Sequence, residues 1–276
     1  MDLVPEAKPS RDQASEVPTV RAPQAVDAEL YDARGIGWDG ELDFYRELVS
    51  QHARGAVLEL ACGTGRVTHA LVGLGADVLG LDRSPWMLAV ARARDGDGGP
   101  RWVEADMRSF RLDHRFGLVL IPAHSFQSLL TPDDQAATLA SIHRHLLPDG
   151  LAVVHLDHPA IDWLAGLPLS GGTVKQGTTV RHPTTGQPWR LAYAWTYERP
   201  TQTATVRMTW ERLGASGEPV ERSALPPQPL HVVGRTEMEH ALARTGFAVE
   251  RLLGDFHGAP FGGESAEMIW VARRTS

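Results

Sequence analysis

The side chains best suited to proton transfer in this chain are histidines that lie near the ends of two apolar runs. His124 lies in the segment PAHSF after one run, and His155 and His158 flank Asp157 at the end of another. An imidazole titrates near neutral pH, so it can take a proton from an ammonium or a phenol. We expect a general base among these three histidines; the alternative for each is a capping or packing role.

The second of these segments, which holds His155, Asp157 and His158, has the residue types of an iron site. Two histidines and one carboxylate form a common ligand set for non-haem iron. Successive side chains of a strand point to opposite faces, so His155, Asp157 and His158 cannot meet one ion without a bend. We therefore expect no metal here, and expect Asp157, which shares a face with His155, to orient a histidine.

A glycine-rich turn between an apolar run and a helical pattern predicts a nucleotide site. Residues 56–70 read AVLELACGTGRVTHA. Glycines let the backbone approach a ligand, and the following helix presents free N–H groups. The dinucleotide fingerprint requires Gly or Ala where Thr68 stands, and Glu59 would repel a pyrophosphate, so the pattern disfavours NAD. The alternative is a plain strand–turn–helix.

Two further carboxylates follow the next two apolar runs. Asp82 ends the run 77–81, about twenty residues after the glycines, where a doubly wound fold places its ribose-binding acid. Asp106 follows the run 101–104. Either could be an ordinary loop carboxylate, but their order behind the glycine turn favours a nucleoside site.

The elements that must position these residues alternate between strand and helix patterns, which indicates a parallel sheet with right-handed crossovers. From about residue 173 to 230 the helical period disappears, and two alternating runs predict an antiparallel hairpin. We expect a doubly wound α/β sheet of seven strands with an antiparallel β insertion. The expected main-sheet strands are 56–61, 77–81, 101–104, 117–121, 151–156, 247–253 and 267–274, a helix spans 38–52, and the hairpin pairs 189–198 with 204–213.

This pattern divides the chain into three parts. Residues 1–28 contain several prolines and mixed charges, and we expect a disordered tail. Residues 29–165 and 231–276 form the expected nucleotide-binding domain. Residues 166–230 form the expected insertion.

The composition of the chain argues against several classes of binding partner. The chain has 276 residues and a formal net charge of −7, and its only lysines are Lys8 and Lys175. With no basic block, we expect no nucleic-acid partner. No apolar stretch approaches the ~20 residues of a membrane helix, and the first residues lack the apolar core of a signal peptide, so no membrane partner is expected. The single cysteine, Cys62, favours a reducing cytoplasm.

Four segments, LELACGTG, GLDRSPWML, EADMRSF and HRHLLPDG, carry a resemblance to a known family. The chain resembles class I S-adenosylmethionine-dependent methyltransferases of secondary metabolism, particularly the aminosugar N,N-dimethyltransferases. The resemblance implies a Rossmann-like sheet, with S-adenosyl-L-methionine as cofactor and S-adenosyl-L-homocysteine as product. It places the glycine loop under the methionine part, Asp106 at the adenine amino group and Tyr31 over the methionine end. It also implies that the insertion, residues 166–230, covers the acceptor or forms a dimer interface. The cofactor residues so implied are Tyr31, Glu59, Ala61, Gly63, Gly65, Asp82, Arg83, Met87, Asp106, Met107 and Pro122.

The expected reaction is methyl transfer to a nitrogen or oxygen of a small-molecule acceptor. Alternatives are C-methylation, a cofactor-binding relative that catalyses a non-methyl reaction such as a cyclisation, and an NAD-type oxidoreductase or non-catalytic binding module. A homodimer is also considered. Aromatic residues are expected to form the acceptor pocket, although each could instead pack the insertion onto the sheet: Trp38, Phe126, Trp195, Tyr197 and Trp210.

Overall fold

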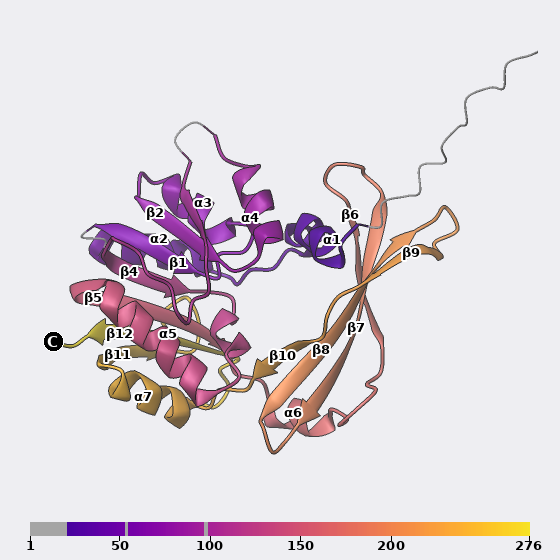
Figure 1. Ribbon diagram of the computed structural model, residues 1–276. Coiled ribbons are helices and arrows are strands. Elements are labelled where there is room, and N and C mark those ends of the chain that lie inside the picture. The colour runs from indigo at the N-terminus through magenta and orange to yellow at the C-terminus, as the bar shows by residue number, and fades with distance from the viewer. Residues whose placement is uncertain (1–20, 53–54, 97–98) are drawn as a thin grey trace, which may run out of the picture.

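A seven-stranded sheet forms one half of the molecule (Figure 1). The computed structural model describes residues 21–276 except 53–54 and 97–98. The strand order is β11-β12-β5-β4-β1-β2-β3, with β12 antiparallel to both of its neighbours and the other pairs parallel. The expected doubly wound fold is confirmed. Its strands are β1 (Ala56–Leu60), β2 (Val78–Asp82), β3 (Arg101–Glu104), β4 (Phe116–Ile121), β5 (Leu146–Asp157), β11 (Phe247–Leu253) and β12 (Glu267–Arg274).

Helices cover both faces of this sheet, because its central strands are apolar on both sides. On one face α5 (Pro132–His145) and α7 (Arg235–Arg244) pack over the core that includes Leu58 and Val119. On the other, α2 (Glu41–His52) and α3 (Arg66–Val72) pack over Val57 and Leu118. The carboxyl ends of the strands therefore stay free for loops that bind ligands.

Side-chain caps set where two helices begin. The Ser84 hydroxyl accepts from the backbone N–H of Met87 at the start of α4 (Pro85–Arg92). The Thr131 hydroxyl accepts from Asp134 N–H at the start of α5. Each helix also has proline in its first turn, as helix starts favour. Three further helices are short: η1 (Asp32–Arg34), η2 (Ser125–Ser128) and α6 (Ile161–Gly166).

A second, antiparallel sheet lies beside the first (Figure 1). Its long hairpin pairs Trp189 with Arg212 at one end and Glu198 with Thr203 at the other, so the expected hairpin is confirmed. The order is β10-β8-β7-β6, and β9 also pairs with β8. Its strands are β6 (Lys175–Arg181), β7 (Pro188–Glu198), β8 (Thr203–Leu213), β9 (Pro219–Ala224) and β10 (Gln228–His231).

The expected tail was wrong for its last residues. Residues 23–28 belong to the helix α1 (Pro23–Leu30), and residues 1–20 lie outside the described part of the chain. Val26 and Leu30 pack into the apolar cluster of the second sheet, and the Trp210 indole donates to the Asp27 carboxylate at 2.9 Å. Tertiary packing orders this segment, and local composition could not reveal that packing. No described helix has the length and hydropathy to cross a membrane.

Candidate active site

The glycine turn joins β1 to α3 through three residues in left-handed backbone conformations: Ala61, Gly63 and Gly65. A Cβ on Gly63 would meet no atom within 4 Å, which leaves the backbone open to a ligand. A Cβ on Gly65 would lie 2.4 Å from the ring of Trp102, so only glycine fits there. Gly65 thus shapes the turn, whereas Gly63 and Ala61 line a cavity.

Asp82 ties this turn to the end of the next strand. One carboxylate oxygen accepts from the Gly63 N–H and the other from the Ser84 N–H, both at 2.8 Å. The residue is 8% exposed, and burial raises the pKa of its carboxyl despite these bonds. A carboxylate fixed this way can still accept from ligand hydroxyls with its remaining lone pairs.

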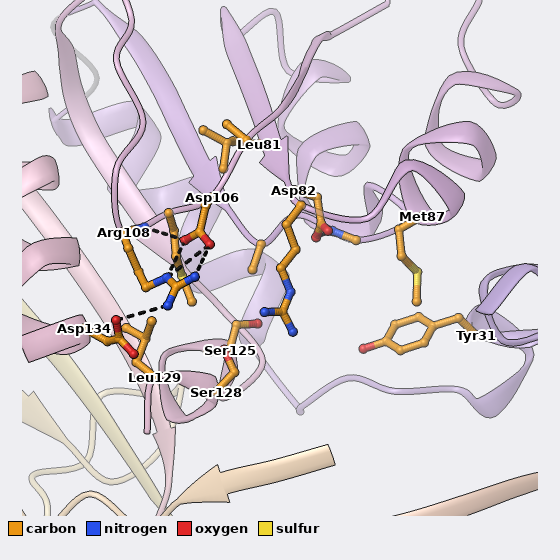
Figure 2. Close-up of a pocket in the computed structure, with 15 residues that line it drawn as sticks. Tyr31, Leu81, Asp82, Met87, Asp106, Arg108, Ser125, Ser128, Leu129 and Asp134 are labelled. Atoms are coloured by element: carbon orange, nitrogen blue, oxygen red, sulfur yellow. Dashed lines mark hydrogen bonds and ion pairs between the residues drawn. The ribbon is translucent and has the colours of Figure 1, made fainter. Parts of the chain in front are cut away.

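Asp106 lies across the same cavity and is held by an arginine (Figure 2). Arg108 donates to both Asp106 oxygens at 2.6–3.1 Å and to Asp134 at 3.1 Å. The hydrogen bond from Arg108 lowers the pKa of Asp106. Arg108 did not figure among the expected site residues, although it follows Asp106 by only two positions.

The donor cavity, as we name this hollow of about 230 Å³, brings together most of the expected cofactor residues. Tyr31 and Met87 lie on the side opposite Asp106 (Figure 2). Ser125 and Ser128 from η2 close the cavity. The expected residues that line it are Tyr31, Ala61, Gly63, Asp82, Arg83, Met87, Asp106 and Met107.

A smaller hollow of about 40 Å³ adjoins the donor cavity and shares Tyr31, Ala61, Gly63 and Ser125 with it. Glu59 and Pro122 line this hollow. Burial raises the pKa of Glu59 to about 8, although the Thr68 hydroxyl donates to its carboxylate. Burial therefore favours the protonated, uncharged form of this carboxyl.

A larger cavity of about 610 Å³, the acceptor cavity, lies between the two sheets. Tyr31 and Ser125 line both it and the donor cavity, so the two hollows meet at these residues. Three expected aromatic residues contribute to its wall: Trp38, Trp195 and Trp210.

Two other aromatic residues do not lie where expected. Phe126 is fully buried in the core of the main sheet, because η2 turns its ring inward. It therefore packs α5 and the strands rather than the cavity. Tyr197 is half-buried near the end of β7 and is not among the residues that line the acceptor cavity.

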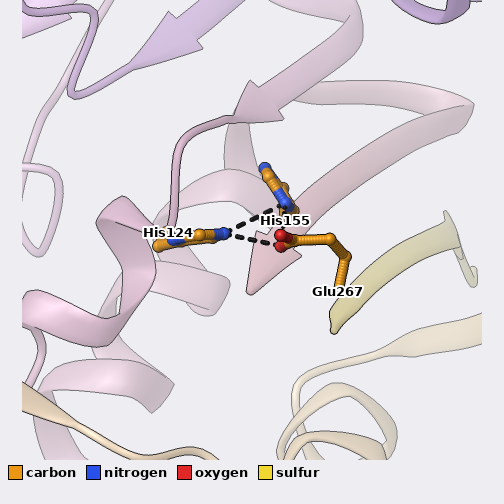
Figure 3. A group of neighbouring side chains, drawn as sticks. All are labelled: His124, His155 and Glu267. Atoms are coloured by element: carbon orange, nitrogen blue, oxygen red, sulfur yellow. Dashed lines mark hydrogen bonds and ion pairs between the residues drawn. The ribbon is translucent and has the colours of Figure 1, made fainter. Parts of the chain in front are cut away.

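His124 meets His155 at the edge of the acceptor cavity (Figure 3). Both Ala123 and His124 adopt left-handed conformations, which are strained for residues other than glycine. The two Nε2 atoms lie 3.2 Å apart, and each lies 2.7 Å from Oε2 of Glu267. Trp38 donates its indole N–H to Oε1 of the same carboxylate at 2.7 Å.

The charges of this group follow from its surroundings. Burial acts to raise the pKa of Glu267, but hydrogen bonds from both histidines outweigh it and lower the pKa to about 2. Burial lowers the pKa of His155 to about 4, against the opposing effect of Glu267. The free protein at neutral pH therefore holds a carboxylate against a neutral, buried His155.

Asp157 and His158 do not join this group. Glu267, rather than Asp157, contacts His155, because β12 pairs with β5 in a register that sets Glu267 opposite Asp157 and one diagonal step from His155. His158 bonds through Nδ1 to the Ser265 carbonyl and packs on Phe261, away from the acceptor cavity. The expected roles of these two residues were therefore misplaced.

Comparisons with known proteins agree with this arrangement. Residues 57–150 match the family model described as a methyltransferase domain. The dTDP-3-amino-3,6-dideoxy-alpha-D-glucopyranose N,N-dimethyltransferase of Streptomyces fradiae is 34% identical over 159 residues, which cover 55% of this chain and 62% of that protein. A glycine/sarcosine N-methyltransferase of Parasynechococcus marenigrum is 35% identical over 153 residues, 52% of each chain. The chain thus matches only about half the length of such curated relatives.

Solved structures match over nearly the whole chain. The CcbJ methyltransferase from Streptomyces caelestis superposes with a TM-score of 0.72 and 24% identity over 92% of this chain and 99% of that one. The sugar N-methyltransferase KedS8 from Streptoalloteichus gives a TM-score of 0.69 and 23% identity, with all of both chains covered. At such identities these likenesses establish the fold. Residues 57–150 are a methyltransferase domain, and the resemblance of the chain to S-adenosylmethionine-dependent methyltransferases, aminosugar N,N-dimethyltransferases among them, is confirmed.

Proposed function

We propose that this protein transfers a methyl group from S-adenosylmethionine to a nitrogen or oxygen of a small-molecule acceptor in bacterial secondary metabolism. The observation that carries the proposal is the meeting of the donor and acceptor cavities at Tyr31 and Ser125. A displacement between two bound molecules requires such a junction, since the reacting atoms must face each other in line. Relatives that methylate aminosugars support nitrogen as the acceptor atom.

The residues of the donor side fit the proposed cofactor in order. The buried carboxyl of Glu59 stands where an ammonium would lie, Asp82 where ribose hydroxyls would lie, and Asp106 at the far end for an adenine amino group. The left-handed backbone at Gly63 leaves open space over the turn. When bound, the cofactor would supply an electrophilic methyl group on a sulfonium.

On the acceptor side, alignment and exclusion of water are the main tasks of the protein. The two sheets and Tyr31 enclose the space in which an acceptor would be held. His124 lines this space, and in the metal-free protein it is the proposed proton acceptor if the nucleophile arrives protonated. Glu267, which accepts a hydrogen bond from Nε2 of His124, would stabilise the resulting imidazolium.

Calorimetry with S-adenosylhomocysteine and with NAD tests the proposal. We expect saturable binding of the first and none of the second, because Thr68 stands where the dinucleotide fingerprint requires Gly or Ala. Binding of NAD alone would overturn the proposal. Tight binding of S-adenosylhomocysteine without methylated product from any amine or phenol would instead favour a non-methyl reaction.

Two features of the whole protein belong to the same proposal. The single cysteine, Cys62, is buried, which suits a protein that works in the reducing cytoplasm.

Exposed apolar side chains lie in α6 and in the segment that follows it, where Ile161 is 81%, Leu169 75% and Val174 62% exposed. We infer that they form the interface of a homodimer.

A further inference from the structure

The group formed by His124, His155 and Glu267 resembles the ligand set of a metal site. In the part of the chain that the structure describes, it is the one group of three such side chains whose donor atoms lie close enough to share an ion. All three donor atoms converge on one point (Figure 3). We propose that these residues bind a divalent transition-metal ion at the edge of the acceptor cavity.

The distances between the donor atoms suit such an ion. They are 2.7, 2.7 and 3.2 Å. An ion about 2.1 Å from each atom, the usual length for zinc bonds to nitrogen and oxygen, would see them at angles of about 80° to 100°. Three ligands at such angles occupy one face of an octahedron and leave the opposite face open.

The surroundings hold the ligands in this arrangement before an ion arrives. The Trp38 indole N–H bonds to Oε1 of Glu267, which leaves Oε2 directed at the two imidazoles. The Trp38 ring also packs edge-on against both histidines, with centroids 4.7 and 4.6 Å away. Outer contacts of this kind order metal ligands and raise affinity.

The strained backbone at Ala123 and His124 also supports a metal site. Two consecutive non-glycine residues in left-handed conformations are strained, so the surrounding structure must hold them there. They bring the imidazole of His124 from a loop to the buried His155 and the partly buried Glu267.

The ligand types select the class of metal and of bound acceptor. Two imidazoles and one carboxylate suit zinc, iron or cobalt better than magnesium or calcium. Because His124 and Trp38 line the acceptor cavity, the open face of the ion would meet the acceptor there. An acceptor with two neighbouring oxygen or nitrogen atoms would chelate the ion. With the ion bound, His124 would serve as a ligand and not as a base.

Direct metal titration tests this proposal without reference to turnover. The full-length protein, stripped with a chelator and dialysed, is titrated with Zn²⁺ against a chromophoric competitor and separately with Co²⁺. We expect one equivalent of each to bind and Co²⁺ to give visible d–d absorption. Absence of stoichiometric binding would overturn the proposal.

Variants decide whether the ion sits at this group. Glu267→Gln and His124→Ala each remove a ligand and should weaken Zn²⁺ binding at least 100-fold. Trp38→Phe removes only the outer hydrogen bond, and about a 10- to 100-fold loss is expected. The control His240→Ala removes an exposed histidine of α7 and should change affinity less than two-fold. Equal affinities in all four variants would refute the site.

The affinity of each variant for S-adenosylhomocysteine separates this proposal from the proposed function. Normal affinity shows that the fold and the donor cavity are intact, so a loss of Zn²⁺ binding then reports on the ligands. A wild-type protein that binds Zn²⁺ but not S-adenosylhomocysteine would refute the proposed function and leave the metal site standing.

Discussion

At the scale of single residues, two carboxylates of the donor side have different tasks. Asp82 is braced by two backbone N–H groups and lies at the junction of the glycine turn and β2. Glu59 is enclosed in the smaller hollow, bonded by Thr68. Asp82 is therefore positioned to accept hydrogen bonds. The burial of Glu59 favours its protonated form until a cation binds beside it.

Asp82→Asn is expected to weaken binding of S-adenosylhomocysteine at least ten-fold. The amide replaces one acceptor oxygen with a donor that would face the N–H of Gly63 or Ser84, and the charge that strengthens hydrogen bonds is lost. Calorimetry of the variant gives the change. Asp77→Asn, at a 61% exposed side chain just before β2, is the matched control and should bind normally. Unchanged affinity of Asp82→Asn would leave Asp82 with no role beyond the loop.

Glu59 is expected to make stability depend on pH. Its pKa in the folded protein is about 8, above the ordinary 4.5, so the unfolded chain loses this proton at a lower pH than the folded protein does. Its contribution to the free energy of unfolding therefore falls as pH rises from about 4.5 to 8. Urea titrations across this window should show Glu59→Gln gaining stability over the wild type as pH rises.

The exposed carboxylate Glu104, at the end of β3, provides the comparison for that experiment. The difference between Glu104→Gln and the wild type should stay constant across this window, since an exposed side chain on the surface contributes little to the free energy of unfolding. A constant difference for Glu59→Gln as well would contradict the raised pKa.

The carboxylates Asp82 and Asp106 could be predicted from sequence because each lies at or just after the end of its own strand, within the stretch 57–150. Glu267 could not, since it lies 143 residues from His124 and 112 from His155. Only the register of β12 against β5 brings it there. Phe126 was misplaced for a similar reason: the turn of η2 decides which way its ring points.

At the scale of elements, α1 packs against the second sheet and stabilises it. Leu30 is fully buried in the cluster that contains Trp189 and Trp210, and Asp27 accepts from the Trp210 indole. The helix is short, and its residues 23–28 lie inside the segment 1–28 that was expected to be disordered. Its order depends on a sheet more than 150 residues later in the chain, which a local pattern does not report.

Leu30→Ala is expected to lower the free energy of unfolding by about 2–5 kcal/mol, through lost burial and the cavity that remains. Urea unfolding followed by tryptophan fluorescence measures it, since Trp189 and Trp210 lie in the same cluster. Leu74→Ala, at a side chain 57% exposed, should change stability by less than about 0.5 kcal/mol. A loss at Leu30 no larger than at Leu74 would show that α1 does not stabilise the fold.

At the scale of the whole molecule, the two sheets contribute to different cavities. The main sheet supplies the donor cavity, and the acceptor cavity exists only where the second sheet and the residues after α1 face it. The sequence pattern predicted both sheets from their periodicities. It did not predict the shape of the space between them, which depends on how the sheets pack.

The proposed homodimer gives a prediction at this scale. Sedimentation of the wild type should give twice the chain mass of 30.1 kDa. Leu169→Glu, which places a charge on the apolar surface around α6, should give the single mass. Leu74→Glu, at another exposed leucine, should remain dimeric. A wild type that sediments as a single chain would rule the dimer out.

The bond from Trp38 to Glu267 spans 229 residues and has a consequence for the order of assembly during translation. At 5–20 residues per second, a ribosome needs roughly 10–50 s to make the intervening chain. The segment 57–150 leaves the ribosome much earlier than β12. The nascent chain therefore carries both histidines for some time before it contains the carboxylate that they contact.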